Sequence, residues 1–270
     1  MNQPLYSVLR GIPVLSSVVV MERLAVDSKL AMGKPGWPAL LLFLPARSIL
    51  LVFGQTLFAV GNRAHLPESR WSAAGAWWTV WGSIADLGCL AILAVMTKRE
   101  GIHLRDLLGP VPRRFLLKGL GYLFLIAPFS ALGTFFAAWI VYGSWQAPMP
   151  AGVVIARVLP HWAIFYSLIV WAPMWSATEE LTYNGYLAPR IASLSGHRWV
   201  PFALVGFWWA AQHSFLPLVL DWRFVLWRFL AFVPGVLSLM VLYLRTQKLA
   251  PVIVAHWLLD LIAAATTLSL

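Results

Sequence analysis

The sequence predicts an all-α membrane protein, a polytopic bundle of about seven transmembrane helices preceded by an N-terminal interfacial helix. The chain of 270 residues is 60% hydrophobic and only 11% charged, whereas a soluble domain carries about 25% charged residues. Its apolar residues gather in stretches of the roughly 20 residues that a helix needs to span a bilayer. Its 16 tryptophans suit the aromatic belts at the two membrane interfaces. A soluble fold could not bury this much apolar surface.

Residues 1–36 are predicted to form an amphipathic segment that lies on the membrane surface. Their apolar run, 12–21, is too short to span, and Glu22 and Arg23 follow it directly. Because no clear small-residue cleavage site follows the run, we do not expect a cleaved signal peptide.

The remaining residues, 37–270, are predicted to form one transmembrane domain. Prolines inside its spans, such as Pro128 and Pro234, are tolerated because neighbouring helices satisfy the freed backbone groups. The longest polar connection, 98–114, holds a short amphipathic piece at 102–108, and a Gly-Pro-Val-Pro sequence ends this piece. In chain order the predicted spans are 37–61, 71–97, 115–142, 161–187, 199–219, 222–244 and 250–270.

Basic residues predict the orientation. The chain has 20 Lys and Arg against 10 Asp and Glu. Most of the basic residues fall in segments predicted to lie on the same side of the membrane as the N-terminus. Basic loops stay in the cytoplasm, so we expect the N-terminus inside and the C-terminus outside. Scattered over short loops, these cations suit anionic lipid headgroups and not nucleic acid. On the opposite side lie Arg63, Arg70, Arg157, Arg223 and Arg228.

The single Cys89 excludes an intrachain disulfide and a CxxC metal site. Cys89 lies in an apolar span, where we expect it to be a small packing residue.

Ionisable residues inside three predicted spans are the candidate site. Such groups are costly in a membrane unless they are paired, so they indicate function. Glu179 and Glu180 are adjacent in apolar sequence. Helical neighbours point about 100° apart, so one glutamate would react and the other would support it. The alternative is a helix end facing lipid headgroups.

Two histidines accompany the glutamates. His213 follows Gln212, and Trp209 lies one turn earlier, where it should stack on the same face. His256 and Asp260 share a helix face, so the aspartate could orient the imidazole, or both could bind a metal. The alternatives are a packing histidine and a hydrogen bond without chemistry. Arg47 and Asp86 are predicted to pair across spans, or Arg47 to snorkel, and we assign them no chemistry.

The order of these motifs resembles the CPBP or Abi family of intramembrane proteases, which includes the type II CAAX prenyl endopeptidases. That family has two adjacent glutamates with Arg, Gly and Leu downstream, then an aromatic residue four positions before a histidine, then a histidine four positions before Asn or Asp. The resemblance covers about 160–265 of this chain. Here Asn184 stands where the family has Arg, and Trp209 replaces the usual Phe. Another basic group, such as Arg190, could substitute for the missing cation.

The resemblance implies glutamate-dependent hydrolysis of a peptide bond without a cofactor or metal. Glu179 would take a proton from water, and His213 would help to place or activate that water. His256 and Asp260 would stabilise the oxyanion, and Glu180 would support the site.

On this basis we expect an intramembrane endopeptidase that acts on a membrane-associated protein or peptide in a prokaryotic inner membrane. Two alternatives stay open. Asn184 favours a non-catalytic membrane-interaction or immunity-type protein of the same family, and the Glu/His/Asp set would also suit a metal-dependent membrane hydrolase.

Overall fold

The computed structural model describes residues 35–61, 70–109, 111, 114–148, 159–197 and 199–267. Within these residues the protein is helical and has no β-strand, as predicted. Residues 1–34 lie outside them, so the N-terminal interfacial helix stays a prediction. The elements are α3 (Trp37–Phe43), α4 (Ala46–Gly61), α5 (Arg70–Gly75), α6 (Trp78–Arg99), α7 (Leu104–Leu108), α8 (Arg114–Tyr142), α9 (His161–Phe165), the π-helix η1 (Tyr166–Trp171), α10 (Ala172–Glu180), the π-helix η2 (Leu181–Leu187), α11 (Ala188–Ser195), α12 (Trp199–Gln212), α13 (Trp222–Thr246) and α14 (Leu249–Thr267).

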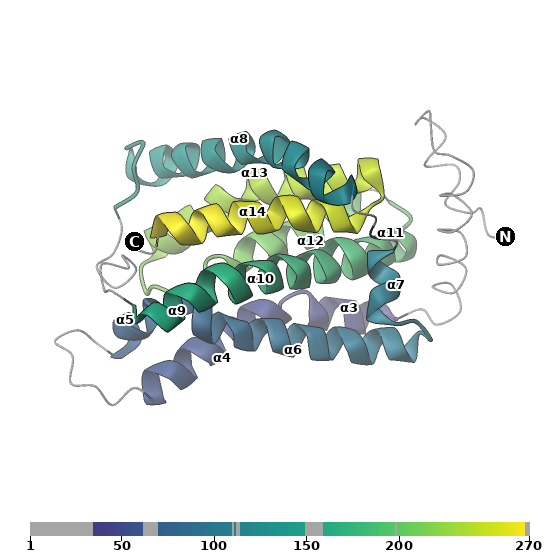
Figure 1. Cartoon of the computed structure of the whole chain (residues 1–270), viewed down its shortest axis with the longest axis horizontal. Helices are drawn as coiled ribbons and strands as arrows, with labels where there is room; N and C mark the ends of the chain where they lie inside the picture. The colour runs from purple at the N-terminus through teal and green to yellow at the C-terminus, as the bar shows by residue number, and fades with distance from the viewer. Residues whose placement is uncertain are drawn as a thin grey trace.

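The long helices lie side by side along one axis of the molecule (Figure 1). α14 packs between α8 and α10, and α10 packs in turn against α6 (Figure 1). α13 packs against both α8 and α12. The segment formed by α10 and η2 is therefore enclosed by other helices, which removes its side chains from lipid.

Five helical stretches are long and apolar enough to cross a membrane: Trp37–Gly61, Trp78–Arg99, Leu117–Tyr142, Trp222–Thr246 and Leu249–Thr266. The other two predicted spans, and so the count of seven, are not confirmed. One lies in a run from His161 to Ser195 that alternates between α- and π-helix. The other corresponds to α12, which has 14 residues and is about 21 Å long at 1.5 Å per residue, shorter than the roughly 30 Å of the hydrocarbon core.

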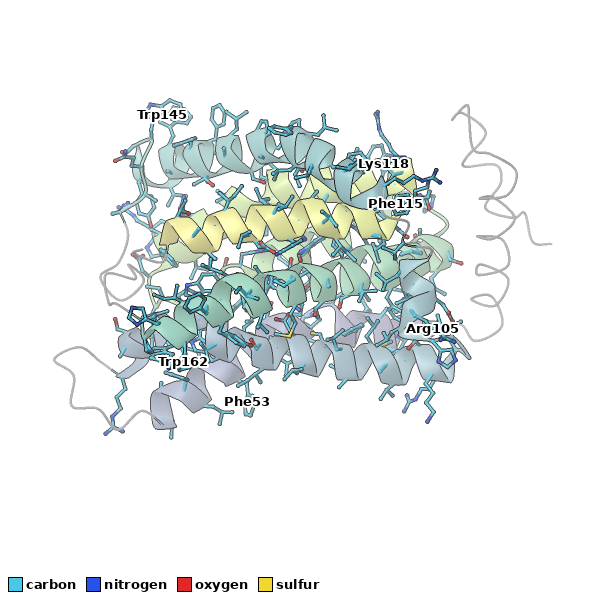
Figure 2. The ribbon with its side chains drawn as sticks, in the orientation of Figure 1. Phe53, Arg105, Phe115, Lys118, Trp145 and Trp162 are labelled. Carbon is cyan, nitrogen blue, oxygen red and sulfur yellow. The ribbon has the colours of Figure 1, made fainter. Side chains whose placement is uncertain are left out.

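The outer surface is apolar along its length and polar or aromatic at its ends. On α8, Leu117, Phe124 and Phe129 are all more than half exposed. A soluble monomer rarely shows a large contiguous surface of this kind, whereas lipid covers it without cost. Figure 2 shows Arg105 and Lys118 at one end of the bundle and Trp145 and Trp162 at the other. The protein is an integral membrane protein.

Candidate active site

The glutamate pair forms the end of α10, inside the bundle. Glu179 and Glu180 are the last two residues of α10, and the helical run continues through η2 and α11 to Ser195. Both side chains are completely buried. The pair therefore does not face lipid headgroups at a helix end.

Two π-helical segments flank α10, and each ends two residues before a proline. η1 ends at Trp171, before Pro173, and η2 ends at Leu187, before Pro189. Proline has no backbone N–H to complete an i→i−4 hydrogen bond, and we attribute the wider i→i+5 turns before it to that loss. Such π segments frequently occur at functional sites, and η2 follows the glutamates directly.

A single imidazole from α14 lies between the two glutamates. His256 Nδ1 is 3.1 Å from Glu180 Oε1, and its Nε2 is 3.6 Å from Glu179 Oε2. Asp260, one turn further along α14, has its Oδ2 atom 3.5 Å from the same Nε2. The adjacent glutamates, which point in different directions, thus reach opposite nitrogens of one ring. Four of the predicted catalytic residues meet here.

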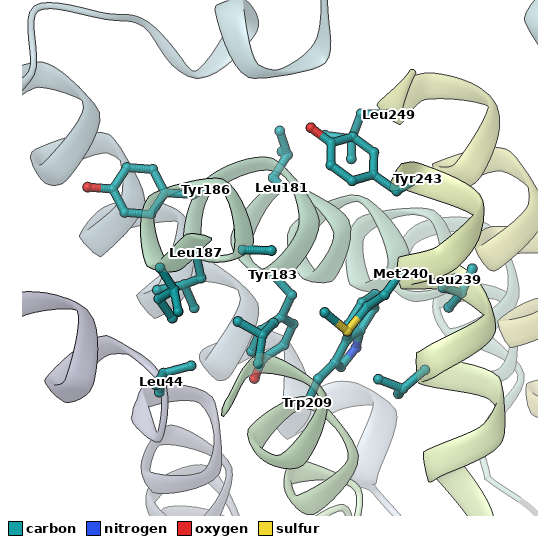
Figure 3. Close-up of a cluster of buried hydrophobic side chains, with 14 of the residues drawn as sticks. Leu44, Leu181, Tyr183, Tyr186, Leu187, Trp209, Leu239, Met240, Tyr243 and Leu249 are labelled. Carbon is teal, nitrogen blue, oxygen red and sulfur yellow. The ribbon is translucent and has the colours of Figure 1, made fainter. Parts of the chain in front are cut away.

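Helix α12 supplies two hydrogen bonds to Glu179. Trp209 donates its indole N–H to Oε2, and Gln212 donates from Nε2 to Oε1 over 2.7 Å. Tyr183 donates its hydroxyl to the Gln212 oxygen over 3.1 Å, and its ring stacks on Trp209 with centroids 5.0 Å apart (Figure 3). Trp209 is thus a direct partner of the carboxylate as well as an aromatic wall.

The second glutamate is held by a residue of η2, the π-helix that follows it. Asn184 donates from Nδ2 to Glu180 Oε2 over 2.7 Å. The Asn184 Oδ1 atom is buried and has no hydrogen-bond partner among the described residues. Asn184 therefore contacts the predicted site but brings no positive charge to it.

A buried cation reaches Glu179 from α4. Arg47 Nη2 lies 3.5 Å from Glu179 Oε1, and Nη1 lies 2.9 Å from Asp86 Oδ1 on α6. Its Nε donates to Gln212 Oε1 over 2.7 Å. The predicted pairing of Arg47 with Asp86 is confirmed, and the same guanidinium also contacts the glutamate.

The suggestion that Arg190 replaces the missing cation is wrong. Arg190 forms an ion pair with Glu100 at the end of α6, and its guanidinium lies 3.5 Å over the ring of Tyr186. It also donates to the Tyr186 carbonyl over 3.0 Å. Glu100 therefore holds this arginine away from the glutamate pair.

His213 lies outside the helix in which we predicted it. α12 ends at Gln212, and His213 begins the turn that follows. Its Nδ1 is 2.9 Å from the Trp209 carbonyl oxygen, and its ring stacks on Phe232, not on Trp209. Among the described residues it makes no hydrogen bond or ion pair with either glutamate. Its side chain is thus a neighbour of the site, joined to it through α12.

The site is closed in this conformation. Glu179 and Glu180 are 0% exposed, His256 4% and His213 5%. A groove of about 470 Å³ lies against α4 and α6 and includes none of these residues; it is lined by Gly54, Leu57, Phe58, Gly61, Trp77 and Ile84. A substrate can reach the carboxylates only if helices or side chains move. Within the described residues, no group of three or more His, Cys, Asp or Glu side chains is arranged to hold a metal ion.

The sequence interpretation missed two groups that touch Glu179. Arg47 was expected only to pair or snorkel, and Gln212 was noted only as a neighbour of His213. Both are polar groups in apolar helices, which was the available signal. Their partners lie 132 and 33 residues away along the chain, and spacing along one helix cannot indicate such contacts.

Comparison with known proteins gives a family match to part of the chain. Residues 157–262 match a family described as Type II CAAX prenyl endopeptidase Rce1-like. All three motifs lie within the match, whereas Arg47 and Asp86 lie outside it. Searches of curated proteins and of solved structures found no significant match.

Proposed function

Residues 157–262 belong to the Rce1-like family of type II CAAX prenyl endopeptidases, and we propose that the protein is a membrane endopeptidase that hydrolyses a peptide bond of a membrane-associated protein or peptide. The observation that carries this proposal is the contact of one imidazole, His256, with both motif glutamates. An acid and a base that are paired and shielded from bulk water can activate a water molecule by general acid–base catalysis.

Glu179 is the proposed general base. Trp209 and Gln212 hold its two oxygens, so the carboxylate has a fixed orientation. In the proposed reaction a water oxygen attacks the peptide carbonyl carbon while Glu179 takes the water proton. The C–N bond then breaks, and the same proton passes to the leaving amine. Glu180 supports the site by holding His256 Nδ1.

His256 is proposed to stabilise the oxyanion through Nε2. This nitrogen lies 3.6 Å from Glu179 and 3.5 Å from Asp260, distances too long for strong hydrogen bonds. Because Nδ1 donates to Glu180, Nε2 carries a proton only in the imidazolium form of the ring, and in that form the proton is available to a developing negative oxygen. Asp260, an acceptor when ionised, contributes by orienting the imidazole.

His213 is proposed to help position the attacking water. A carbonyl oxygen can only accept, so His213 Nδ1 must donate to Trp209. In the neutral ring this leaves Nε2 as the acceptor. His213 directly follows Gln212, a hydrogen-bond partner of Glu179, but its ring stacks on Phe232, so the ring must turn toward Glu179 for this role.

The test uses the full chain in liposomes with a fluorogenic peptide that ends in a prenylated cysteine and three further residues, in ¹⁸O-labelled water. We expect a single cleavage and label in the new carboxylate. Glu179→Gln and His213→Ala should each lower the rate at least about 100-fold, while both variants insert and melt like the wild type. The same peptide without its prenyl group shows whether the lipid is recognised.

The complete burial of the glutamates and the uncharged Asn184 favour a second candidate, a membrane-interaction protein of the same family without catalysis. Full activity of Glu179→Gln would refute the assigned base. Absence of cleavage by the wild type, together with unchanged cellular effects of the Glu179 and His213 variants, would favour this second candidate.

A further inference from the structure

The positive charge beside the proposed base comes from a helix outside the family segment. The residue one turn after Glu180 is Asn184, which is neutral, and the next arginine on this run is bound to Glu100. Arg47 on α4 instead places its guanidinium 3.5 Å from Glu179 Oε1. Family motifs alone would not select this arginine.

Several contacts fix the guanidinium. Nη1 lies 2.9 Å from Asp86, Nε donates to Gln212 over 2.7 Å, and the ring of Trp175 lies 4.2 Å beneath it. Arg47 is 1% exposed and Asp86 is completely buried. The planar guanidinium of arginine, with its several N–H donors, suits such a buried site better than the ammonium group of lysine does.

Gln212 joins the arginine to the base. Its oxygen accepts from Arg47, and its nitrogen donates to the same Glu179 oxygen that faces the arginine. The guanidinium therefore acts on Glu179 in two ways, by charge and by orienting the amide. Because the interior has a low dielectric, both effects are stronger there than in water.

We propose that Arg47 is the positioning residue of this enzyme, supplying from α4 the cation that holds Glu179 in its orientation. This inference rests on the proposed function. The competing explanation is that Arg47 serves only to neutralise Asp86. The two explanations differ in what happens when Arg47 and Asp86 are removed together.

The experiment compares Asp86→Asn, the double variant Arg47→Gln with Asp86→Asn, and Arg47→Lys, using the prenylated fluorogenic peptide in liposomes. The double variant leaves no unpaired charge at this pair, so we expect it to melt within a few degrees of the wild type. Its kcat should fall about 100-fold, because the carboxylate of Glu179 would no longer be held in position. Its KM should change less than about threefold. Asp86→Asn alone removes one partner of the guanidinium but leaves Arg47 beside Glu179, so this variant should keep more of its kcat than the double variant does. Arg105→Gln removes an equal charge from an exposed position and should match the wild type.

A wild-type kcat in the folded double variant would overturn the proposal. If that variant does not accumulate, Arg47→Lys decides. This change keeps the charge but cannot reach Asp86, Gln212 and Glu179 together, so we expect about tenfold lower kcat, and an unchanged value would overturn the proposal. If Glu179→Gln were active, the proposed function itself would be refuted. The two failures are thus distinguishable.

Discussion

At the scale of single residues, one amide organises the site. Gln212 accepts from Arg47 and from Tyr183 and donates to Glu179. Every one of these groups is buried, so none can turn to water when the amide is lost. The cost of an unsatisfied buried polar group then falls on three partners at once.

Gln212→Leu replaces this amide with an apolar side chain of similar size. We expect a loss of about 1–3 kcal/mol for each group that stays unsatisfied, and about 100-fold lower kcat because Glu179 is no longer oriented. Thermal unfolding in detergent and the peptide assay measure the two effects.

Gln55 provides the matched control. It is also buried, but it bonds both the N–H and the carbonyl of Leu218, away from the glutamates. Gln55→Leu should lose stability while the remaining folded protein keeps its kcat. Equal kcat values in the two leucine variants would contradict the role of Gln212.

The residues that could be predicted are those whose signal is local. His256 and Asp260 lie four apart on one helix, and the adjacent glutamates are unusual in apolar sequence, so both pairs could be singled out, and the structure brings them together. Arg47 could not be assigned to Glu179 because its contact depends on how α4 packs in the bundle. His213 was misplaced because its apolar surroundings continue beyond the point where α12 ends.

At the scale of elements, the close helix crossings depend on small residues. A Cβ atom at Gly133 on α8 would lie 2.6 Å from the Ala231 carbonyl oxygen of α13 and 3.0 Å from Pro234. Small residues at such crossings allow membrane helices to approach closely. A backbone oxygen cannot rotate away, so the helices themselves would have to separate.

Gly133→Ala should therefore destabilise the bundle by about 1–3 kcal/mol, the usual cost of overpacking. Gly121→Ala on the same helix is the control, since a Cβ there meets nothing within 4 Å. It should be neutral or slightly stabilising, because alanine favours helix more than glycine does. Unfolding of both variants in detergent measures the difference, and equal stabilities would contradict the crossing argument.

The long apolar helices were predictable because their length and composition suffice. α8, α13 and α14 begin and end within a few residues of the predicted spans. The π turns of η1 and η2 were not predicted, because the residue pattern does not indicate where the backbone hydrogen bonds change from α-helical to π-helical spacing. Of the two prolines that follow them, Pro173 was expected only to be tolerated, and no interpretation was made of Pro189.

At the scale of the whole molecule, the distribution of basic residues predicts which end of the bundle faces the cytoplasm. Arg105 and Lys118 lie at one end, opposite Trp145 (Figure 2). The positive-inside tendency applies to short loops of this kind. The cytoplasmic leaflet, rich in anionic lipid, would then contact the end that carries these cations.

Cysteine labelling tests this orientation, and the chain is well suited to it. Cys89 is its only cysteine and is buried, so Cys89→Ala provides a cysteine-free background at small cost in packing. In that background Arg105→Cys and Trp145→Cys place a thiol at either end, at positions with exposed side chains. We expect a membrane-impermeant maleimide to label the cysteine at position 145 in intact cells, and the one at position 105 only after the membrane is opened. The reverse pattern would show that the cations face outward, so that the charge distribution does not set the orientation of this protein.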